Sequence, residues 1–341
     1  MINFYKIMFF FSLISGTLIS ISSYSWLGMW VGLEINLLSI IPLMNNSKNL
    51  FSSEASLKYF ITQALASSIL LFSIILLMSM DNFINNMNLN NLNIIIMNSA
   101  LLTKTGAAPF HFWFPEVMEG LNWMNSLILL TWQKLAPMIL LMYNLNMTTF
   151  FTIIIIMCLT VGSIMGLNQI SLRKILAYSS INHIGWMIAA MMFLELIWLY
   201  YFIIYTIISL NIILIFNYFK IFFIKQLFSS FNQNPSLKMM FSFNFFSLGG
   251  LPPFLGFFPK WLTIQMLVQN KFYFLTFTMI IMTLITLYYY IRISFSSLLL
   301  NNSELNFKLD PFLPTKNFYI FLFNFISLLS LIFCTIVFNW L

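Results

Sequence analysis

Apolar runs of about 20 residues recur from one end of this 341-residue chain to the other, with few charges between them. Runs of this length match a helix that crosses a lipid bilayer. Residues 69–77 and 151–159 are apolar on every face, whereas the strands of a membrane β-barrel alternate between apolar and polar residues. The chain is therefore predicted to be an all-α polytopic membrane protein.

The composition excludes several classes of function. Hydrophobic residues make up 61% of the chain, and the longest polar stretches, 81–93 and 301–317, are too short to bury the core of a soluble domain. Cys158 and Cys334 lie in separate apolar runs and the chain has 2 histidines, so no iron–sulfur or structural zinc site is expected. No glycine-rich phosphate-binding motif follows a strand pattern, which argues against nucleotide binding.

The apolar runs predict about eleven transmembrane helices. The expected spans are 3–22, 25–44, 56–80, 94–113, 122–143, 148–167, 173–192, 195–218, 238–268, 272–296 and 318–340. If the chain crosses the membrane eleven times, the lysines and arginines in the loops and near the span ends lie on the same side as the N-terminus. Only Lys271 lies on the other side. Positive charge marks the cytoplasmic or matrix face, so the N-terminus is predicted on that face and the C-terminus opposite.

The spans form two blocks of five and a final helix. The predicted parts are a first five-helix repeat at 1–145, a second at 146–296, and a loop with the last helix at 297–341. The fourth span of each block combines glycine, proline and lysine, near 104–109 and near 249–260, and we expect a broken helix there. Because five is odd, two such blocks in tandem have inverted orientations, and broken helices at matching positions of inverted halves mark transport sites.

Four charged residues inside apolar runs are the candidate site residues. They are Glu34, Lys104, Lys134 and Lys260. A lysine near the bilayer centre costs roughly 2.5–3.5 kcal/mol on insertion scales, and snorkelling would have to cover about 15 Å from these positions. The purely structural interpretation is that glycine and proline are common in membrane helices and that lysines snorkel. It does not fit lysines this far from the span ends. An ion or proton path is the better interpretation.

Ordered motifs around these residues carry a resemblance to a known family. The matching strings are Trp30–Asn36, Ser53–Phe60, Gly106–Trp113, Thr131–Pro137, Gly166–Gln169, Leu172–Ser180 with His183, Ser247–Pro253 and Pro259–Trp261. They run in order over residues 26–292. The sequence resembles the antiporter-like, proton-translocating membrane subunits of mitochondrial NADH:ubiquinone oxidoreductase, respiratory complex I, in their animal form.

The resemblance implies a role for each candidate residue. Glu34 would pair with Lys104 on the first broken helix, Lys134 would link the halves, and Lys260 would belong to the second broken helix. Burial lowers the pKa of a lysine and a nearby carboxylate raises it, so movement of Glu34 relative to Lys104 would switch the lysine between holding and releasing a proton. His183 lies in mid-span and is either a relay between Lys134 and Lys260 or a hydrogen-bonded structural histidine.

The resemblance also implies an environment. The chain would be an obligate subunit of a proton-translocating NADH:ubiquinone reductase in the mitochondrial inner membrane, next to antiporter-like and small membrane-arm subunits and to phospholipids, with no nucleic acid. NADH, FMN, iron–sulfur clusters and ubiquinone would be bound by other subunits, since this chain offers no redox site.

Two other classes of function share these features. A subunit of a multi-component cation/proton antiporter would have the same fold and buried lysines, and its activity would depend on sodium. A non-pumping structural spacer would need neither Glu34 nor the central lysine, so variants that remove these charges would separate it from a pump.

Overall fold

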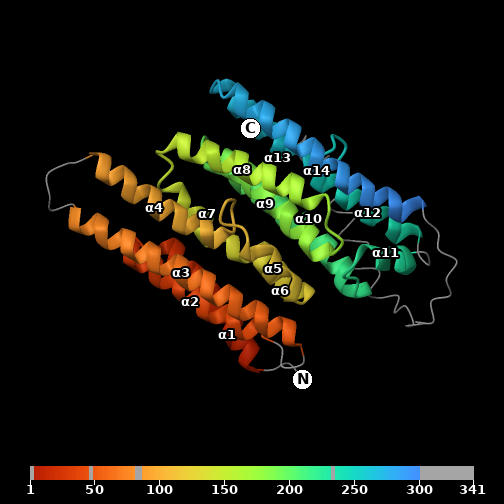
Figure 1. Cartoon of the computed structure of the whole chain (residues 1–341), viewed down its shortest axis with the longest axis horizontal. Coiled ribbons are helices and arrows are strands. Elements are labelled where there is room, and N and C mark those ends of the chain that lie inside the picture. Colours follow the sequence, from red (N-terminus) through yellow and green to blue (C-terminus); the bar gives the residue numbers. More distant parts are fainter. Residues whose placement is uncertain (1–3, 46–48, 81–86, 232–234, 300–341) are drawn as a thin grey trace. The chain divides into compact units, whose positions relative to one another are not determined.

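The computed structural model describes residues 4–45, 49–80, 87–231 and 235–299 (Figure 1). These residues form fourteen helices, and the described part contains no β-strand beyond one isolated bridge between Ser171 and Phe223. The helices are α1 (Phe4–Ser22), α2 (Trp26–Met44), α3 (Leu50–Met80), α4 (Met87–Thr105), α5 (Trp113–Gly120), α6 (Trp123–Leu130), α7 (Trp132–Met142), α8 (Thr148–Gly166), α9 (Leu172–Met191), α10 (Glu195–Phe219), α11 (Ile224–Phe231), α12 (Pro235–Gly249), α13 (Phe257–Gln269) and α14 (Tyr273–Leu299).

Seven stretches of helix in the described part are long and apolar enough to cross a membrane. They are Phe4–Ser22, Trp26–Met44, Leu50–Ser79, Trp123–Met142, Thr148–Gly166, Glu195–Phe219 and Tyr273–Leu298. The prediction of an all-α polytopic membrane protein is therefore confirmed. The last expected span, 318–340, lies outside the described residues.

The chain divides into two compact units, the first of which covers Met1–Cys158. In this unit α1 packs on α2, α3 packs on α2, α4 and α5, and α7 packs on α1, α4 and α6. Two predicted spans are interrupted here, the fourth of them within the range 104–109 where a break is expected. The fourth helix ends at Thr105 rather than continuing to residue 113, and the fifth is interrupted at Thr131, between α6 and α7. Downstream, Pro137 inside α7 has no N–H to offer the carbonyl one turn before it, at Gln133.

The second unit begins at Leu159 and is built around α9. Every residue of α9 except Arg173 and Lys174 is buried, and the helix packs against α10, α13 and α14. Because protein surrounds it, α9 can carry serine, asparagine and histidine in mid-helix. These polar residues explain why α9 is not among the seven long apolar stretches given above. The short helix α11, which the sequence analysis did not predict, contacts α12 and α14.

Candidate functional site: two helix breaks with buried lysines

The two glycine-proline segments form breaks with the same backbone structure. Before each break a helix ends, at Thr105 and at Gly249, and the next residue is a glycine with positive φ, 77° at Gly106 and 78° at Gly250. That region of φ is costly for residues with a Cβ. The hydrogen bonds also match: Ala107 N–H donates to Leu102 O at 3.1 Å, and Leu251 N–H donates to Phe246 O at 3.2 Å.

The second half-helices also begin in the same register. If Gly106 is aligned with Gly250, α5 and α13 start at equivalent positions, and Phe114-Pro115-Glu116 falls on Phe258-Pro259-Lys260. Lys104 then falls on Leu248, not on Lys260. The lysines of the two breaks thus lie on opposite sides of their glycines, and Glu116 takes the place of Lys260 in the first unit.

Lys260 binds the carbonyl groups that its own break leaves free. Its Nζ donates to Leu248 O at 3.3 Å and to Gly249 O at 2.9 Å, and its side chain lies across Gly250. Its Nζ also lies 5.7 Å from the centre of the Trp186 ring. The C-terminal end of a helix carries partial negative charge, so these carbonyl groups stabilise a cation at this point.

Lys104 has different surroundings. It is 7% exposed, and among the described residues its Nζ has no hydrogen-bond partner. Glu34 interacts with it electrostatically, although no ion pair within 4 Å joins the two in the described part of the chain. The carbonyl equivalent to that of Leu248, Lys104 O, accepts from the amide of Gln63 at 3.4 Å. A neutral amide therefore takes the position that Lys260 occupies in the second break.

Lys104 lines a small cavity inside the first unit. Its lining residues are Leu33, Asn36, Leu37, Tyr59, Gln63, Lys104, Gln133 and Pro137, and its volume is about 10 Å³, close to what a single water molecule needs. Gln133 joins the polar lining together, because its amide donates to Asn36 Oδ1 at 2.9 Å and its carbonyl oxygen accepts from the Tyr59 hydroxyl at 3.3 Å. The cavity thus brings Lys104 to the residues that flank Lys134 on α7.

Lys134 is 1% exposed and lies beside the first break. Its Nζ is 5.6 Å from the centre of the Phe114 ring, and Cys158 interacts with it electrostatically. The Cys158 thiol in turn accepts a hydrogen bond from the Ala108 N–H at 3.2 Å, so it holds the loop of the break.

His183 lies in the second unit, one turn before Trp186 on α9, and is 4% exposed. Its Nδ1 is 2.9 Å from the hydroxyl of Tyr201, and its ring centre is 5.1 Å from that of Tyr205. Trp186, one turn further along α9, has its ring beside Lys260 Nζ. The link from His183 to Lys134 stays a prediction.

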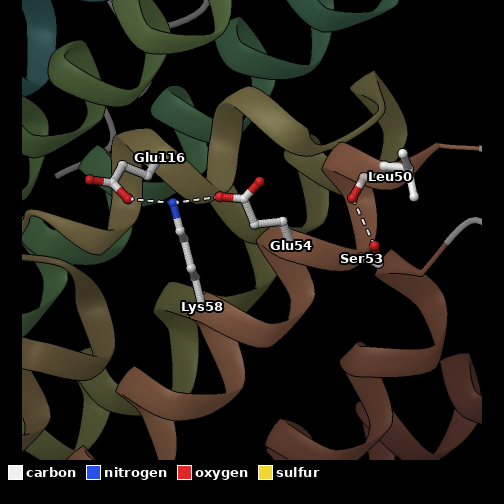
Figure 2. A network of polar contacts seen from close by, with 5 residues as sticks. All are labelled: Leu50, Ser53, Glu54, Lys58 and Glu116. Carbon is white, nitrogen blue, oxygen red and sulfur yellow. Dashed lines mark hydrogen bonds and ion pairs between the residues drawn. The ribbon is translucent and has the colours of Figure 1, made fainter.

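Glu116 belongs to an ion-pair network that the sequence analysis recognised only in part. Figure 2 shows Lys58 between the carboxylates of Glu54 and Glu116, each 2.9 Å from its Nζ. The Glu54–Lys58 pair was predicted from its spacing on one helix. Glu116 was missed, although the repeated Phe-Pro motif could have shown that it is the counterpart of Lys260. All three side chains are substantially exposed.

Other polar residues around the site were also missed. Asn36, Gln63 and Gln133 could have been found as polar residues inside apolar runs, whereas Tyr59 and Tyr201 give no such signal, because tyrosine is common throughout this chain. No group of three or more His, Cys, Asp or Glu side chains among the described residues could hold a metal ion.

Comparison with known proteins agrees on one family. The family model described as NADH:quinone oxidoreductase/Mrp antiporter, transmembrane, matches residues 23–286. The chain is 54% identical over 335 residues to NADH-ubiquinone oxidoreductase chain 2 of Anopheles gambiae, with 97% of each chain covered, and 56% identical over 333 residues to that of Aedes aegypti, again with 97% of each covered. It is 40% identical to the protein of the same name from Lemur catta, over 89% of each chain.

Solved structures share the fold. A chain of respiratory complex I from Thermus thermophilus superposes with a TM-score of 0.86 at 23% identity, over 96% of this chain and 78% of that one. A chain of the Mrp complex from Dietzia sp. superposes with a TM-score of 0.72 at 16% identity, over 85% of this chain and 60% of that one. The family match and the curated relatives together show that the chain belongs to the antiporter-like membrane subunit family of NADH:quinone oxidoreductases, alongside the animal chain 2 proteins.

Proposed function

We propose that this chain is a core membrane-arm subunit of respiratory complex I, in which it takes part in proton translocation coupled to electron transfer from NADH to ubiquinone. The names of its relatives, from mosquitoes to a lemur, support membership of that oxidoreductase. The antiporter description of the family and the buried lysines support a share in proton movement. On this proposal the chain contributes to the translocase activity of the whole complex.

The proposed layout is the one that the sequence predicts: about eleven transmembrane helices, two inverted five-helix repeats at 1–145 and 146–296, and a final helix in 297–341. The matching hydrogen bonds of the two breaks support a repeat. The chain would lie in the mitochondrial inner membrane, with its N-terminus on the matrix side, as the distribution of lysine and arginine favours.

The surroundings of the Lys104 ammonium group are the observation that supports the proposal most directly. An ammonium group taken out of water costs several kcal/mol unless hydrogen bonds and an opposite charge compensate it, yet Lys104 Nζ has no hydrogen-bond partner among the described residues. It faces a polar cavity and interacts with Glu34. This arrangement suits a group that exchanges its proton.

The proposed relay uses Glu34, Lys104, Lys134, His183 and Lys260 together with water. Glu34 stabilises the protonated form of Lys104, and Lys104 releases its proton when the two side chains move apart. A water in the cavity would connect Lys104 to the Gln133 side of α7 and so toward Lys134. Lys260 and His183 would continue the path in the second unit.

Partners and cofactors follow from membership of the complex. The chain would pair with neighbouring antiporter-like and small membrane subunits and with phospholipids, which would cover large exposed apolar residues such as Phe11, Phe72 and Phe277. NADH, FMN, iron–sulfur clusters and ubiquinone would be bound by other subunits.

Proton translocation in assembled complex that carries Lys134→Ala tests the proposal. We expect translocation to fall by roughly 10²-fold, the lower end of what a positioned proton carrier contributes, while assembly is retained. Lys225→Ala is the matched control, because Lys225 is an exposed lysine on α11 and should leave translocation unchanged. NADH oxidation and proton movement would be measured on the same proteoliposomes.

The alternatives predict other results in the same assay. If Lys134→Ala keeps both full electron transfer and full proton movement, the chain is a spacer and the relay is wrong. If proton movement in the wild type requires sodium and stops without it, the cation/proton antiporter reading replaces the proposal.

A further inference from the structure

Three polar side chains in the first unit form a hydrogen-bonded chain beside the cavity of Lys104. Gln133 is in the middle of it: its amide donates to Asn36 Oδ1 at 2.9 Å, and its carbonyl oxygen accepts from the Tyr59 hydroxyl at 3.3 Å. The chain joins three helices, because Asn36 belongs to α2, Tyr59 to α3 and Gln133 to α7. All three residues line the cavity together with Lys104. The chain therefore forms one wall of the space beside the Lys104 side chain.

The hydrogen bonds of this chain have a direction that is set at Asn36. Asn36 Oδ1 is an acceptor, so it takes the NH2 group of Gln133 and leaves the Gln133 carbonyl oxygen for Tyr59. A phenol hydroxyl has a single hydrogen, and Tyr59 uses it in the bond to Gln133. The Tyr59 oxygen can therefore meet a group in the cavity only as an acceptor.

Lys104 supplies the matching donors. An ammonium group has three N–H donors and no acceptor, and Lys104 Nζ has no hydrogen-bond partner among the described residues although the side chain is buried. A Tyr59 hydroxyl that turned its hydrogen into the cavity would oppose these donors. The charge on Lys104 thus favours the same direction that Asn36 sets, and the cavity has a donor and an acceptor in its lining.

One water molecule fits between this donor and this acceptor. The cavity volume is about 10 Å³, close to the space that one water needs, and a water held there requires about two to four polar partners. Lys104, Tyr59 and Gln63 are polar lining residues that can supply them. Gln63 also fixes the backbone of Lys104, because its amide donates to Lys104 O at 3.4 Å. A water in this cavity would accept from Lys104 and donate to Tyr59.

The Tyr59 ring is held in place by contacts that do not involve its hydroxyl. Tyr59 is buried, and its ring packs edge-on against the Trp113 ring, with 5.7 Å between the ring centres. Trp113 is itself tied to the first break, because its indole N–H donates to Thr103 O at 3.1 Å. The Tyr59 oxygen thus has a fixed position relative to the residue next to Lys104, and its removal should leave the ring where it is.

We propose that Tyr59 and Gln133 are positioning residues, which hold a single water as the hydrogen-bond partner of Lys104 when Glu34 moves away. This inference rests on the proposed function and adds the residues that orient the water next to Lys104. Gln133 acts through Tyr59, since it keeps the phenol hydrogen out of the cavity. Without the Tyr59 oxygen the water has no fixed acceptor, so the proton of Lys104 has no aligned path toward α7.

Tyr59→Phe tests the assignment, because it removes the acceptor oxygen and keeps the ring. The matched control is Tyr143→Phe at the end of α7, since the Tyr143 side chain is 56% exposed, packs edge-on against Trp26 and does not line the cavity. We expect the initial rate of proton translocation per assembled complex to fall severalfold in Tyr59→Phe. The rate in Tyr143→Phe should stay at the wild-type value.

A double-substitution cycle with Gln133→Leu shows whether Gln133 acts through Tyr59. Gln133→Leu lets the Tyr59 hydroxyl turn its hydrogen into the cavity, so we expect this variant to be slow as well. In the Tyr59→Phe background the same substitution should add little, because the oxygen that Gln133 orients is already absent. Two independent packing defects would instead multiply their losses, and that result would overturn the assignment. Gln265→Leu on α13 is the control for the loss of an exposed amide.

Comparison with Lys134→Ala separates this inference from the proposed function. If Tyr59→Phe translocates protons as fast as Tyr143→Phe while Lys134→Ala does not, the positioning role is wrong and the proposed function stands. If Lys134→Ala also retains translocation, the proposed function itself fails. Should Tyr59→Phe not assemble, Gln133→Leu alone decides the matter, and a wild-type rate in that variant overturns the positioning role.

Discussion

The two helix breaks have the same backbone and put it to different uses. Both end a helix with a positive-φ glycine and restart it with an aromatic-Phe-Pro sequence followed by a charged residue. In the second break the charged residue is Lys260, which returns to bind the carbonyls of Leu248 and Gly249. In the first break it is Glu116, which turns to an exposed lysine on α3.

The difference lies in the hydrogen bonds that each buried lysine makes. Lys260 donates hydrogen bonds to two carbonyl oxygens of its own break. Lys104 comes before its glycine, so it cannot return to the carbonyls of its own break, one of which already accepts from Gln63. The shared backbone thus binds one lysine to the carbonyl groups of its own break and leaves the other beside Glu34 and a polar cavity.

Replacement of each buried lysine by methionine should separate the two helix breaks most clearly, because the two lysines make different contacts. Lys260→Met leaves two buried carbonyl oxygens without their donor, at a cost of about 1–3 kcal/mol each. Lys104→Met breaks no hydrogen bond of Nζ among the described residues, but it leaves the Glu34 carboxylate without its nearby positive charge. We expect Lys260→Met to lower the temperature at which purified complex loses NADH oxidation, and Lys104→Met to lower it less. Equal shifts in the two variants would contradict the assignment of different roles.

The positive-φ glycines of the two breaks should also differ in how well they tolerate alanine. Alanine at either position costs about 1–2 kcal/mol because of the left-handed conformation. At Gly250 the added Cβ would also lie 2.8 Å from Lys260 Cδ, whereas at Gly106 it would meet the Phe114 ring at 3.2 Å. We expect Gly250→Ala to destabilise the complex more than Gly106→Ala and to reduce proton translocation as well. Gly249→Ala is the control, since its Cβ would make only ordinary contacts, the nearest at 3.6 Å.

The sequence could predict the breaks, because glycine, proline and lysine in an apolar run leave few other structures. It could also predict Lys134 as a buried residue, since its run is apolar on both sides. The composition of the two segments did not reveal that Lys104 and Lys260 lie at different positions of their breaks, which only the register of the glycines shows. The interruption at Thr131 could not be predicted, because neither glycine nor proline marks it. Nor could the contact between Tyr201 and His183, since the two residues come from different helices that only folding brings together.

Neutralising Glu116 on α5 should change the complex least of all these substitutions. Glu116→Gln removes one of two carboxylates beside Lys58, and Glu54 remains in place at 2.9 Å. Exposed pairs of this kind contribute little and are screened by salt, so the thermal stability and translocation of the complex should match wild type, with Glu54→Gln behaving alike. A marked loss of assembly in Glu116→Gln alone would mean that a neighbouring subunit covers this network. The first break would then also depend on a fixed charge, supplied by a partner rather than by its own carbonyl groups.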